Sequence, residues 1–300
     1  MKKEKIFQLR QSLILLVTAT IWGTAFVAQS VGMEHVGPFT FIAARFALGA
    51  LALLPVILLQ NRRLKADGIG KGKMADGRAG SGKVLWKGGL LCGVALMSAA
   101  SLQQVGIMRT TVGKAGFITA MYIIIVPILG VFMGRRIRPL IWGCVLLAAA
   151  GLYLLSMSGA FSLQSGDALC LACAVIFAVQ IMLVDHYVEV ADGVRLSAIQ
   201  FLTASALGTV MMLLFEHPSL GAAWNARVPI LYAGIMSSGV AYTLQIIGQR
   251  GLNPTIASLI MSLESVIAAA AGFIFLHQTF TGRELCGCIL MAAAIVLAQL

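Results

Sequence analysis

The chain has 300 residues, of which 59% are hydrophobic and 11% are charged, and its formal net charge is +11. A soluble domain carries about 25% charged residues, so this composition excludes a soluble globular protein, and it excludes a disordered chain as well. The Lys and Arg residues lie in short segments between apolar runs, not along one face with aromatic residues between them. This distribution argues against a nucleic-acid partner, and we expect a membrane protein.

Apolar runs with few charged residues, long enough to cross a bilayer, occur ten times along the chain. About 20 residues are needed, because the hydrocarbon core is about 30 Å thick and a helix rises about 1.5 Å per residue. The runs cover residues 11–33, 38–59, 88–108, 115–134, 139–157, 167–185, 196–215, 228–249, 254–276 and 284–300. The expected fold is therefore an all-α integral membrane protein with ten transmembrane helices.

The first and fourth runs have features that affect their interpretation. A basic segment precedes the first run, as in a signal peptide, but the apolar stretch 11–33 is longer than a signal-peptide core and no small-residue cleavage pattern follows. We expect this helix to be retained. In the fourth run, Pro127 lies deep inside the span, where it should bend the helix.

The basic residues predict the orientation of the chain. Most Lys and Arg residues fall in the N-terminal segment, the 61–87 loop, the 135–138 turn and the two positions Arg195 and Arg250. The connections on the other side hold Arg109, Lys114, Arg227 and Arg283. Because basic loops stay on the cytoplasmic side, we expect a multi-pass protein of the cell (plasma) membrane with cytoplasmic N- and C-termini. The loop 61–87 sets this orientation, with contact to anionic lipid as an alternative role.

The residues that would indicate an enzyme or a metal site are poorly placed for that purpose. Cys170 and Cys173 form a C-x-x-C pattern on an apolar helix without histidine partners, and the four histidines lie in loops or at helix ends. No hydrolase or metalloprotease motif is present. We expect no enzyme activity, no metal and no cofactor. An integral-membrane enzyme and a non-transporting scaffold or receptor remain as alternatives.

The chain resembles itself when one half is aligned with the other. With a shift of 155 positions, residues 18–26 align with 173–181, so that Trp22 corresponds to Phe177. With a shift of 142, Gln103 corresponds to Gln245, and further equivalent pairs are Gly106 with Gly248 and Tyr122 with Glu264. The sequence thus predicts two repeats of five helices, residues 11–157 and 165–300.

Five is an odd number, so the second repeat enters the membrane in the opposite direction from the first. Inverted repeats of this kind are typical of secondary transporters, whose substrate site lies near the middle of the bilayer between the two halves. An enzyme or a scaffold has no need of this symmetry. The repeat therefore favours a carrier over the alternatives.

Six segments of the chain form a recognisable series: IWGTAFVAQ (21–29), FIAARFALGALALLP (41–55), GFITAMYIIIVPILGVFMGRR (116–136), SGDALCLACAVIFAVQ (165–180), YAGIMSSGVAYTLQIIGQR (232–250) and SLIMSLESVIAAAAGFIF (258–275). Together, in this order and spacing, they resemble the drug/metabolite transporter superfamily, in its ten-helix form with paired EamA repeats. The chain departs from the family pattern at Glu264-Ser265, where Glu-Pro is common. It also departs at Gly134-Arg135 and His277-Gln278, where Gly-Glu is frequent.

Two charged residues lie inside predicted spans, where an unpaired charge is costly and functional roles are expected. Glu264 is near the middle of the ninth span, and we expect it to face a central cavity and to bind a cationic group or take up a proton. A protonated or Arg-paired structural carboxyl is the alternative. Arg45, in the second span, could attract an anionic substrate, or it could instead snorkel outward or pair with a buried acid.

The family resemblance implies further residues of the cavity, because helices 1, 3, 4, 6, 8 and 9 surround it in that family. The candidate lining residues are Trp22, Thr24, Gln29, Gln103, Thr119, Tyr122, Gln180, Tyr242, Gln245 and Glu264. The candidates for charge coupling are Glu264, Arg45 and Asp185. Each polar member is equally a candidate for an interhelical hydrogen bond.

The predicted function is secondary transport of a small organic solute by alternating access. The resemblance points to export of an amino acid, a metabolite or a drug-like compound. The expected partners are a small-molecule substrate and the lipid bilayer. The small-residue spacings Gly89/Gly93 and Gly130/Gly134 suit either close packing within the chain or a homodimer.

Overall fold

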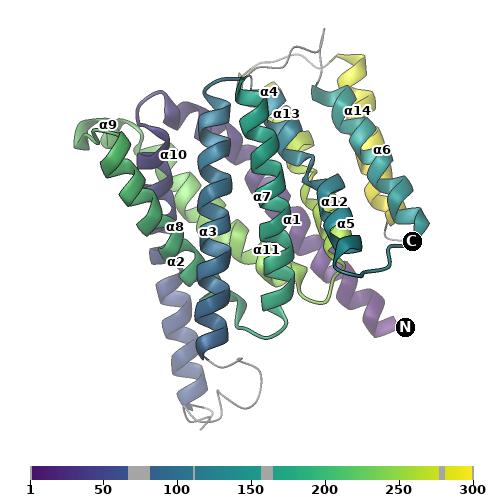
Figure 1. Ribbon diagram of the computed structural model, residues 1–300, viewed down its shortest axis with the longest axis horizontal. Coiled ribbons are helices and arrows are strands. Elements are labelled where there is room, and N and C mark those ends of the chain that lie inside the picture. Colours follow the sequence, from purple (N-terminus) through teal and green to yellow (C-terminus); the bar gives the residue numbers. More distant parts are fainter. Residues whose placement is uncertain (1, 67–81, 111, 157–164, 277–280, 299–300) are drawn as a thin grey trace.

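The computed structural model describes residues 2–66, 82–110, 112–156, 165–276 and 281–298, and this part of the chain folds entirely into helices and their connections (Figure 1). Most of the 61–87 loop and the pair His277-Gln278 lie outside the described residues. The helices are α1 Lys2–Met33, α2 Pro38–Ala66, α3 Gly82–Ile107, α4 Val112–Ala120, α5 Tyr122–Phe132, α6 Pro139–Ser156, α7 Ser165–Val188, α8 Gly193–Phe215, α9 Leu220–Asn225, α10 Arg227–Leu231, the π-helix η1 Tyr232–Tyr242, α11 Thr243–Gln249, α12 Pro254–Met261, α13 Glu264–Leu276 and α14 Gly282–Ala298.

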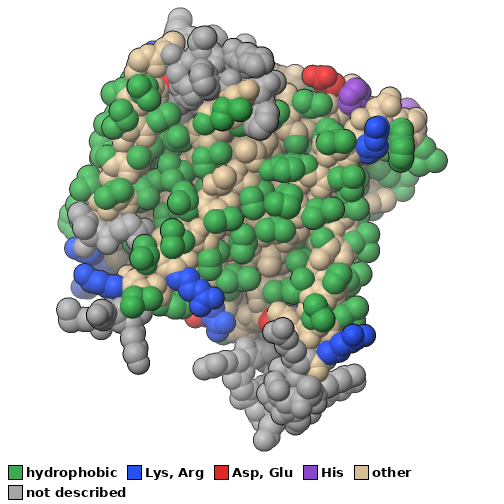
Figure 2. Space-filling model, turned by 180° about the vertical axis from the view of Figure 1, so that it is seen from behind, with side chains coloured by type: hydrophobic (Ala, Val, Ile, Leu, Met, Phe, Trp, Pro, Cys, Tyr) green, Lys and Arg blue, Asp and Glu red, His purple; other side chains and the backbone are tan. Residues whose placement is uncertain are grey.

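Seven segments of the described chain are long and apolar enough to cross a membrane. They are Lys5–Met33, Pro38–Arg62, Gly82–Ile107, Ala115–Phe132, Ser165–Val188, Gly193–Phe215 and Arg227–Gln249. Pro139–Leu154 and Pro254–Ala268 are shorter apolar helices, so the all-helical membrane fold is confirmed while the exact number of ten spans stays a prediction. Figure 2 shows hydrophobic side chains covering the flanks of the molecule, with most of the visible Lys and Arg residues at one end.

The spanning segment Ala115–Phe132 and the shorter apolar helix Pro254–Ala268 are interrupted, at equivalent positions of the two repeats. Met121 separates α4 from α5, and residues 262–263 separate α12 from α13. The sequence predicted a bend at Pro127, whereas the structure breaks the span at Met121 and continues α5 through the proline. The second repeat has no proline near its break. There, the Ser262 hydroxyl donates to the Leu259 carbonyl at 2.7 Å, a local bond of the kind that bends helices.

The packing of the helices follows the symmetry of the repeats. The α2 helix packs on its equivalent α8, and α6 packs on its equivalent α14 at one edge of the bundle (Figure 1). The α3 helix packs on α7 and α8, and its equivalent, the η1–α11 segment, packs on α1 and α2. In the same way α1 packs on α13, and its equivalent α7 packs on α4 and α5. Every one of these contacts recurs when the two repeats are exchanged, as two inverted repeats require.

A pair of glycine contacts shows the same symmetry at atomic scale. A Cβ atom at Gly106 would lie 2.6 Å from the Cys170 sulfur, and one at Gly248 would lie 2.8 Å from the Leu15 Cδ2 atom. Gly106 corresponds to Gly248, and Leu15 corresponds to Cys170. Both glycines therefore permit the same close approach between the third helix of one repeat and the first helix of the other.

The Gly89/Gly93 spacing serves packing within the chain. A Cβ atom at Gly89 would lie 2.4 Å from the Ile199 Cγ2 atom, and one at Gly93 would lie 2.5 Å from the Thr203 Cβ atom. Both neighbours belong to α8 of the same chain. These glycines thus let α3 and α8 approach closely, and they do not present a surface to a second copy.

Candidate functional site

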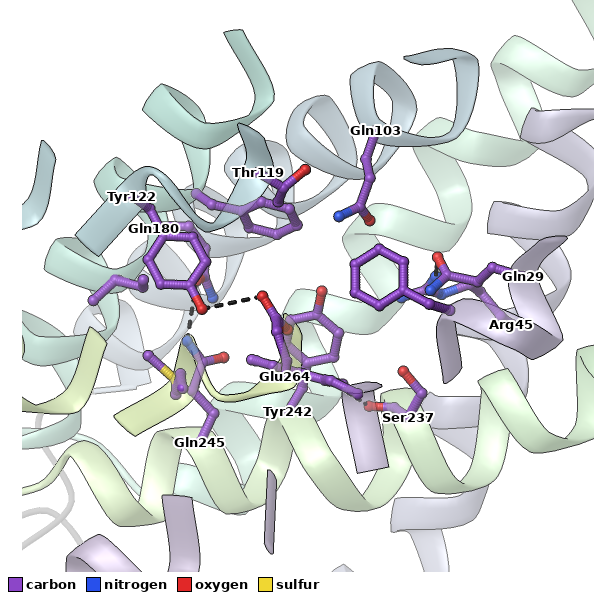
Figure 3. Close-up of a pocket in the computed structure, with 15 residues that line it drawn as sticks. Gln29, Arg45, Gln103, Thr119, Tyr122, Gln180, Ser237, Tyr242, Gln245 and Glu264 are labelled. Atoms are coloured by element: carbon purple, nitrogen blue, oxygen red, sulfur yellow. Dashed lines mark hydrogen bonds between the residues drawn. The ribbon is translucent and has the colours of Figure 1, made fainter. Parts of the chain in front are cut away.

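A buried cavity lies where the two repeats meet (Figure 3). Its walls come from α1, α2, α3, α4, α5, α7, η1, α11, α12 and α13, so both repeats contribute. The lining residues are Trp22, Phe26, Gln29, Arg45, Gln103, Thr119, Tyr122, Phe177, Gln180, Ile181, Ser237, Tyr242, Gln245, Met261 and Glu264. The free volume is about 40 Å³, enough for a few water molecules but too small for an organic solute.

The structure brings together nearly all of the residues that the sequence placed at the cavity. Every predicted lining residue is present except Thr24, and Arg45 is present too. The Thr24 hydroxyl instead bonds with the Tyr232 hydroxyl and lies within 3.1 Å of the Thr20 carbonyl of its own helix. Thr24 therefore links α1 to η1 away from the cavity.

Asp185, the third candidate for charge coupling, lies far along α7 toward the end of the helix. Its carboxylate forms an ion pair with Arg135, which follows α5. Close by, the Gly251 amide donates to the Glu189 carboxylate at 2.8 Å. Asp185 therefore belongs to a polar cluster at one end of the bundle and is not brought to the cavity.

Glu264 occupies the first position of α13, directly after the break in the ninth span. Its side chain is 6% exposed, and it accepts a hydrogen bond of 3.1 Å from the Tyr122 hydroxyl (Figure 3). Tyr122 occupies the first position of α5, after the equivalent break in the first repeat. The two helix breaks thus place two equivalent residues in contact.

Arg45 adopts neither of the structural roles considered from the sequence. Its side chain is 3% exposed, so it does not snorkel outward, and no carboxylate of the described residues lies within ion-pair distance of it. The guanidinium donates to the Gln29 side-chain oxygen at 2.9 Å and stacks 4.7 Å from the centre of the Phe46 ring. The result is a buried cation among neutral groups.

Several polar atoms around the cavity have no partner within the described chain. They are Arg45 Nε, Thr119 Oγ1 and Gln245 Oε1. The Gln245 amide donates to Gln180 at 3.3 Å, and Gln180 donates to Gln200 at 3.2 Å. Because an unsatisfied buried polar atom costs about 1–3 kcal/mol, these atoms point to water or to a ligand as their partner.

Aromatic rings form the apolar part of the wall. The Trp22 and Tyr242 rings lie 4.6 Å apart between centroids, and the Trp22 indole N–H donates to the Ser237 carbonyl at 3.3 Å. Phe26 and Phe177 complete this part of the lining. The cavity therefore offers an apolar surface as well as charged and amide groups.

The sequence reasoning missed a few lining residues, most of them apolar. They are Phe26, Phe177, Ile181, Ser237 and Met261. The repeat alignment carried the signal for two of them, since Phe177 corresponds to Trp22 and Met261 to Thr119. Selecting polar residues alone discarded it. Ser237 lies on the π-helix, which no periodicity in the sequence indicated.

Comparisons with known proteins agree with this architecture. The model of the EamA-like transporter family matches residues 10–157 and again 164–300. An uncharacterized transporter of Archaeoglobus fulgidus is 27% identical over 99% of this chain and 88% of its own length. A chloroplastic WAT1-related protein of Arabidopsis thaliana is 24% identical over 95% of this chain and 68% of its own.

Weaker similarities extend the same picture. Protein PecM of Dickeya dadantii is 33% identical over 69 residues, which is 23% of each chain. A solved crystal structure matches with a TM-score of 0.76 over 96% of both chains at 20% identity, which supports the fold. With the family model matching both repeats of a helical membrane protein, the chain belongs to the EamA-like transporter family.

Proposed function

We propose that this chain is a secondary transporter that exports a small organic solute across the plasma membrane by alternating access. The observation that carries the proposal is the buried polar cavity at the interface of the two repeats. Membrane transporters of several folds bind their substrates at such an interface. In this proposal both termini and the Arg135–Asp185 pair lie on the cytoplasmic side.

The small volume of the cavity supports a cycle with at least two shapes. A space of about 40 Å³ cannot hold an amino acid or a drug-like compound, so the walls must move apart for a solute to bind. The breaks at Met121 and at residues 262–263 lie directly beside the cavity. In this proposal the two breaks act as hinges. A helix that is already interrupted can bend at the break without disrupting the hydrogen bonds of a regular helix.

In this cycle Glu264 is the residue on which movement of the solute depends. It is buried, it faces the cavity, and Tyr122 is the group that donates a hydrogen bond to it. A buried carboxylate needs a proton or a cationic partner. If that partner binds on one side of the membrane and is released on the other, the charge of Glu264 is coupled to the movement of the two repeats relative to each other.

The first test is mass spectrometry of the medium around cells that overproduce the chain. Cells with an empty vector, with Glu264→Gln and with Glu34→Gln would be grown in parallel; Glu34 is an exposed glutamate away from the cavity. We expect a solute to accumulate with the wild type and Glu34→Gln, but not with Glu264→Gln. Equal media for the wild type and the empty vector would contradict export, and accumulation with Glu264→Gln would contradict the role of the carboxylate.

A second test separates a carrier from a channel. The purified full-length chain would be reconstituted in vesicles loaded with the exported solute. An alternating-access carrier exchanges faster when the same solute is present on the far side, because the loaded protein returns more readily than the empty one. A flux that is indifferent to the far-side solute would exclude alternating access.

A further inference from the structure

A row of buried polar side chains leads from the cavity toward the end of the bundle at which α7 and α11 finish. The Gln245 amide donates to Gln180 at 3.3 Å, and the Gln180 amide donates to Gln200 at 3.2 Å. One turn beyond Gln245 on α11, the Gln249 amide donates to the Ile181 carbonyl of α7 at 3.4 Å. Gln180 and Gln245 line the cavity (Figure 3), and Gln249 lies outside its walls. The row therefore begins at the cavity and continues past it between the packed helices.

Four polar atoms along this row have no partner within the described chain. They are Gln245 Oε1, Gln200 Nε2, Gln249 Oε1 and, one turn from Gln200 on α8, Ser197 Oγ. Their side chains are at most 1% exposed. Buried polar groups in proteins are nearly all satisfied, and ordered water is the partner where the chain offers none. One water molecule joins two polar atoms about 5.5 Å apart, which is about the rise of one helical turn.

The row ends beside a pocket at the end of the bundle. Asp185, Glu189 and Gly251 belong to the wall of this pocket, and the last two are exposed. Asp185 lies one turn after Ile181 on α7, and Gly251 lies two residues after Gln249. The row thus spans the distance between the cavity and a surface that water reaches. In the proposed function this surface is the cytoplasmic one.

The first repeat does not reproduce the row. At three equivalent positions it carries buried apolar side chains, namely Ala25 for Gln180, Ile42 for Ser197 and Ile107 for Gln249. The two other equivalents, Gln103 and Arg45, are polar and line the cavity itself. Helices in the same arrangement therefore pack with apolar groups at these positions, so assembly does not require the polar ones. Because the repeats are inverted, the polar row leads to one end of the bundle alone.

We propose that this row holds a file of buried water molecules that carries protons between the pocket at the end of α7 and the Glu264 carboxylate. A proton from the pocket binds to the first water molecule, and each water molecule passes one proton on as it receives another. The last one transfers its proton to a carboxylate oxygen of Glu264. The sum is the uptake of one proton from the aqueous side and the neutralisation of one carboxylate. The amides and the hydroxyl hold the water molecules in place and are not themselves changed.

The surroundings of Glu264 are consistent with a proton that comes from solvent. Three titratable groups interact with this carboxyl, namely Tyr122, Tyr242 and Cys173. Phenols and thiols ordinarily lose their protons only in alkaline solution. Arg45 acts on Tyr242. The side chains that α1 and α4 place in the cavity wall do not titrate, and α6 adds no described residue to that wall. The inference rests on the role of Glu264 in the proposed function.

The test follows the proton on Glu264 by infrared spectroscopy of the purified full-length chain in lipid. The carbonyl stretch of a protonated carboxyl moves to lower frequency when water is replaced by deuterium oxide. A band that is absent from Glu264→Gln belongs to Glu264. Gln249→Ile and Ser197→Ile introduce the residues of the first repeat. Each should slow the shift of this band by about tenfold or more, because the apolar side chain takes the place of a water molecule and removes one of its partners.

Two further variants separate the water file from a general effect on folding. Gln104 is a buried glutamine of α3 whose polar atoms also lack a partner in the described chain, but it does not line the cavity. It corresponds to Ile246, so Gln104→Ile is the matched control and should exchange at the rate of the wild type. Gln249→Ala removes the same amide as Gln249→Ile but leaves room for water, and it should keep most of the rate. Equal slowing in Gln104→Ile and Gln249→Ile would assign the effect to packing and overturn the inference.

The remaining outcomes distinguish this inference from the transport function. If the band shifts equally fast in the wild type, Gln249→Ile and Ser197→Ile, protons reach Glu264 by another route and the inference is wrong. If no band depends on Glu264 at any pH at which the chain stays folded, Glu264 holds no proton and the inference fails as well. Neither result bears on solute export, which is measured in the medium. If the variants slow the shift but the wild type exports no solute, the water file stands and the transport function fails.

Discussion

Equivalent positions on the third helix of each repeat carry different side chains. In α3, Ala95 and Ala100 stand where the second repeat has Ser237 and Tyr242. The α3 helix is a regular α-helix, whereas residues 232–242 form a π-helix, a form often found at functional sites. Ser237 and Tyr242 line the cavity while the two alanines do not. The shared scaffold is therefore symmetric, while at these two positions the second repeat alone contributes to the cavity wall.

The two ends of the α2–α8 pair show the same contrast. At one end, the Glu216 carboxylate accepts hydrogen bonds of 2.7 Å and 2.8 Å from the Phe39 and Thr40 amides and one of 2.6 Å from the Thr40 hydroxyl. At the other end, the equivalent contact is a bond of 2.7 Å from Arg195 to the Asn61 side-chain oxygen. The two equivalent contacts thus differ in strength: three hydrogen bonds join a carboxylate at one end, and a single hydrogen bond joins a side-chain amide at the other.

The largest expected effect comes from removing the cavity carboxylate. Glu264→Gln should reduce export to the level of the empty vector, because an amide neither takes up a proton nor neutralises a cation. The equivalent change in the first repeat, Tyr122→Phe, removes one hydrogen bond to a charged group, and we expect a loss of about tenfold. The rate of solute release from preloaded cells measures both. Equal losses would show that the two positions do not differ as proposed.

Removing the cavity cation should separate stability from activity. Arg45→Gln takes away a buried charge that has no counterion in the described part of the chain, and burial of an unpaired charge is costly. We expect the unfolding temperature to stay the same or rise, while the apparent affinity for solute falls about tenfold. Thermal unfolding and vesicle exchange on the same preparation measure the two quantities. A large loss of stability would indicate a structural arginine.

The two ends of the α2–α8 pair should differ in their contribution to stability. Glu216→Ala removes the cap of α2 and should lower the free energy of unfolding by about 1–3 kcal/mol. Asn61→Ala at the equivalent position should cost about 1 kcal/mol or less, since one hydrogen bond is lost. Thermal unfolding of both variants beside the wild type gives the comparison. A greater loss of free energy of unfolding for Asn61→Ala than for Glu216→Ala would contradict the prediction that the contact at Glu216 is the more stabilising one.

The smallest expected effect concerns Asp185, which the sequence singled out beside Glu264. The pair with Arg135 is partly exposed, with side-chain accessibilities of 39% for Arg135 and 12% for Asp185, and such pairs contribute about 0–1 kcal/mol. Asp185→Asn should leave solute preference unchanged and alter the export rate by no more than about twofold. A loss of export as large as that of Glu264→Gln would place Asp185 in the transport cycle.

Much of the fold could be predicted because hydropathy and internal similarity are properties of the linear chain. The apolar runs predicted an all-helical membrane protein, and the resemblance between halves predicted the paired repeats that the family model matches. Tyr122 and Glu264, which the alignment made equivalent, hydrogen-bond across the interface of the repeats in the structure. A pseudo-two-fold axis relates the two repeats, and two equivalent residues contact each other when they lie beside that axis. The internal similarity of the sequence therefore also bears on which residues are close in space.

Other features depended on side-chain contacts that no linear pattern contains. Trp22 and Thr24 are two positions apart on α1, yet Trp22 lines the cavity and Thr24 bonds to Tyr232. The helix breaks, the π-helix and the unpaired burial of Arg45 likewise arise from packing between distant segments. The sequence by itself determined that the protein lies in a lipid bilayer, that it is helical and that it contains two repeats. These properties follow from the local composition and from the similarity between the two halves. The tertiary structure alone decided which polar groups meet, because that depends on how helices far apart in the chain turn their faces toward one another.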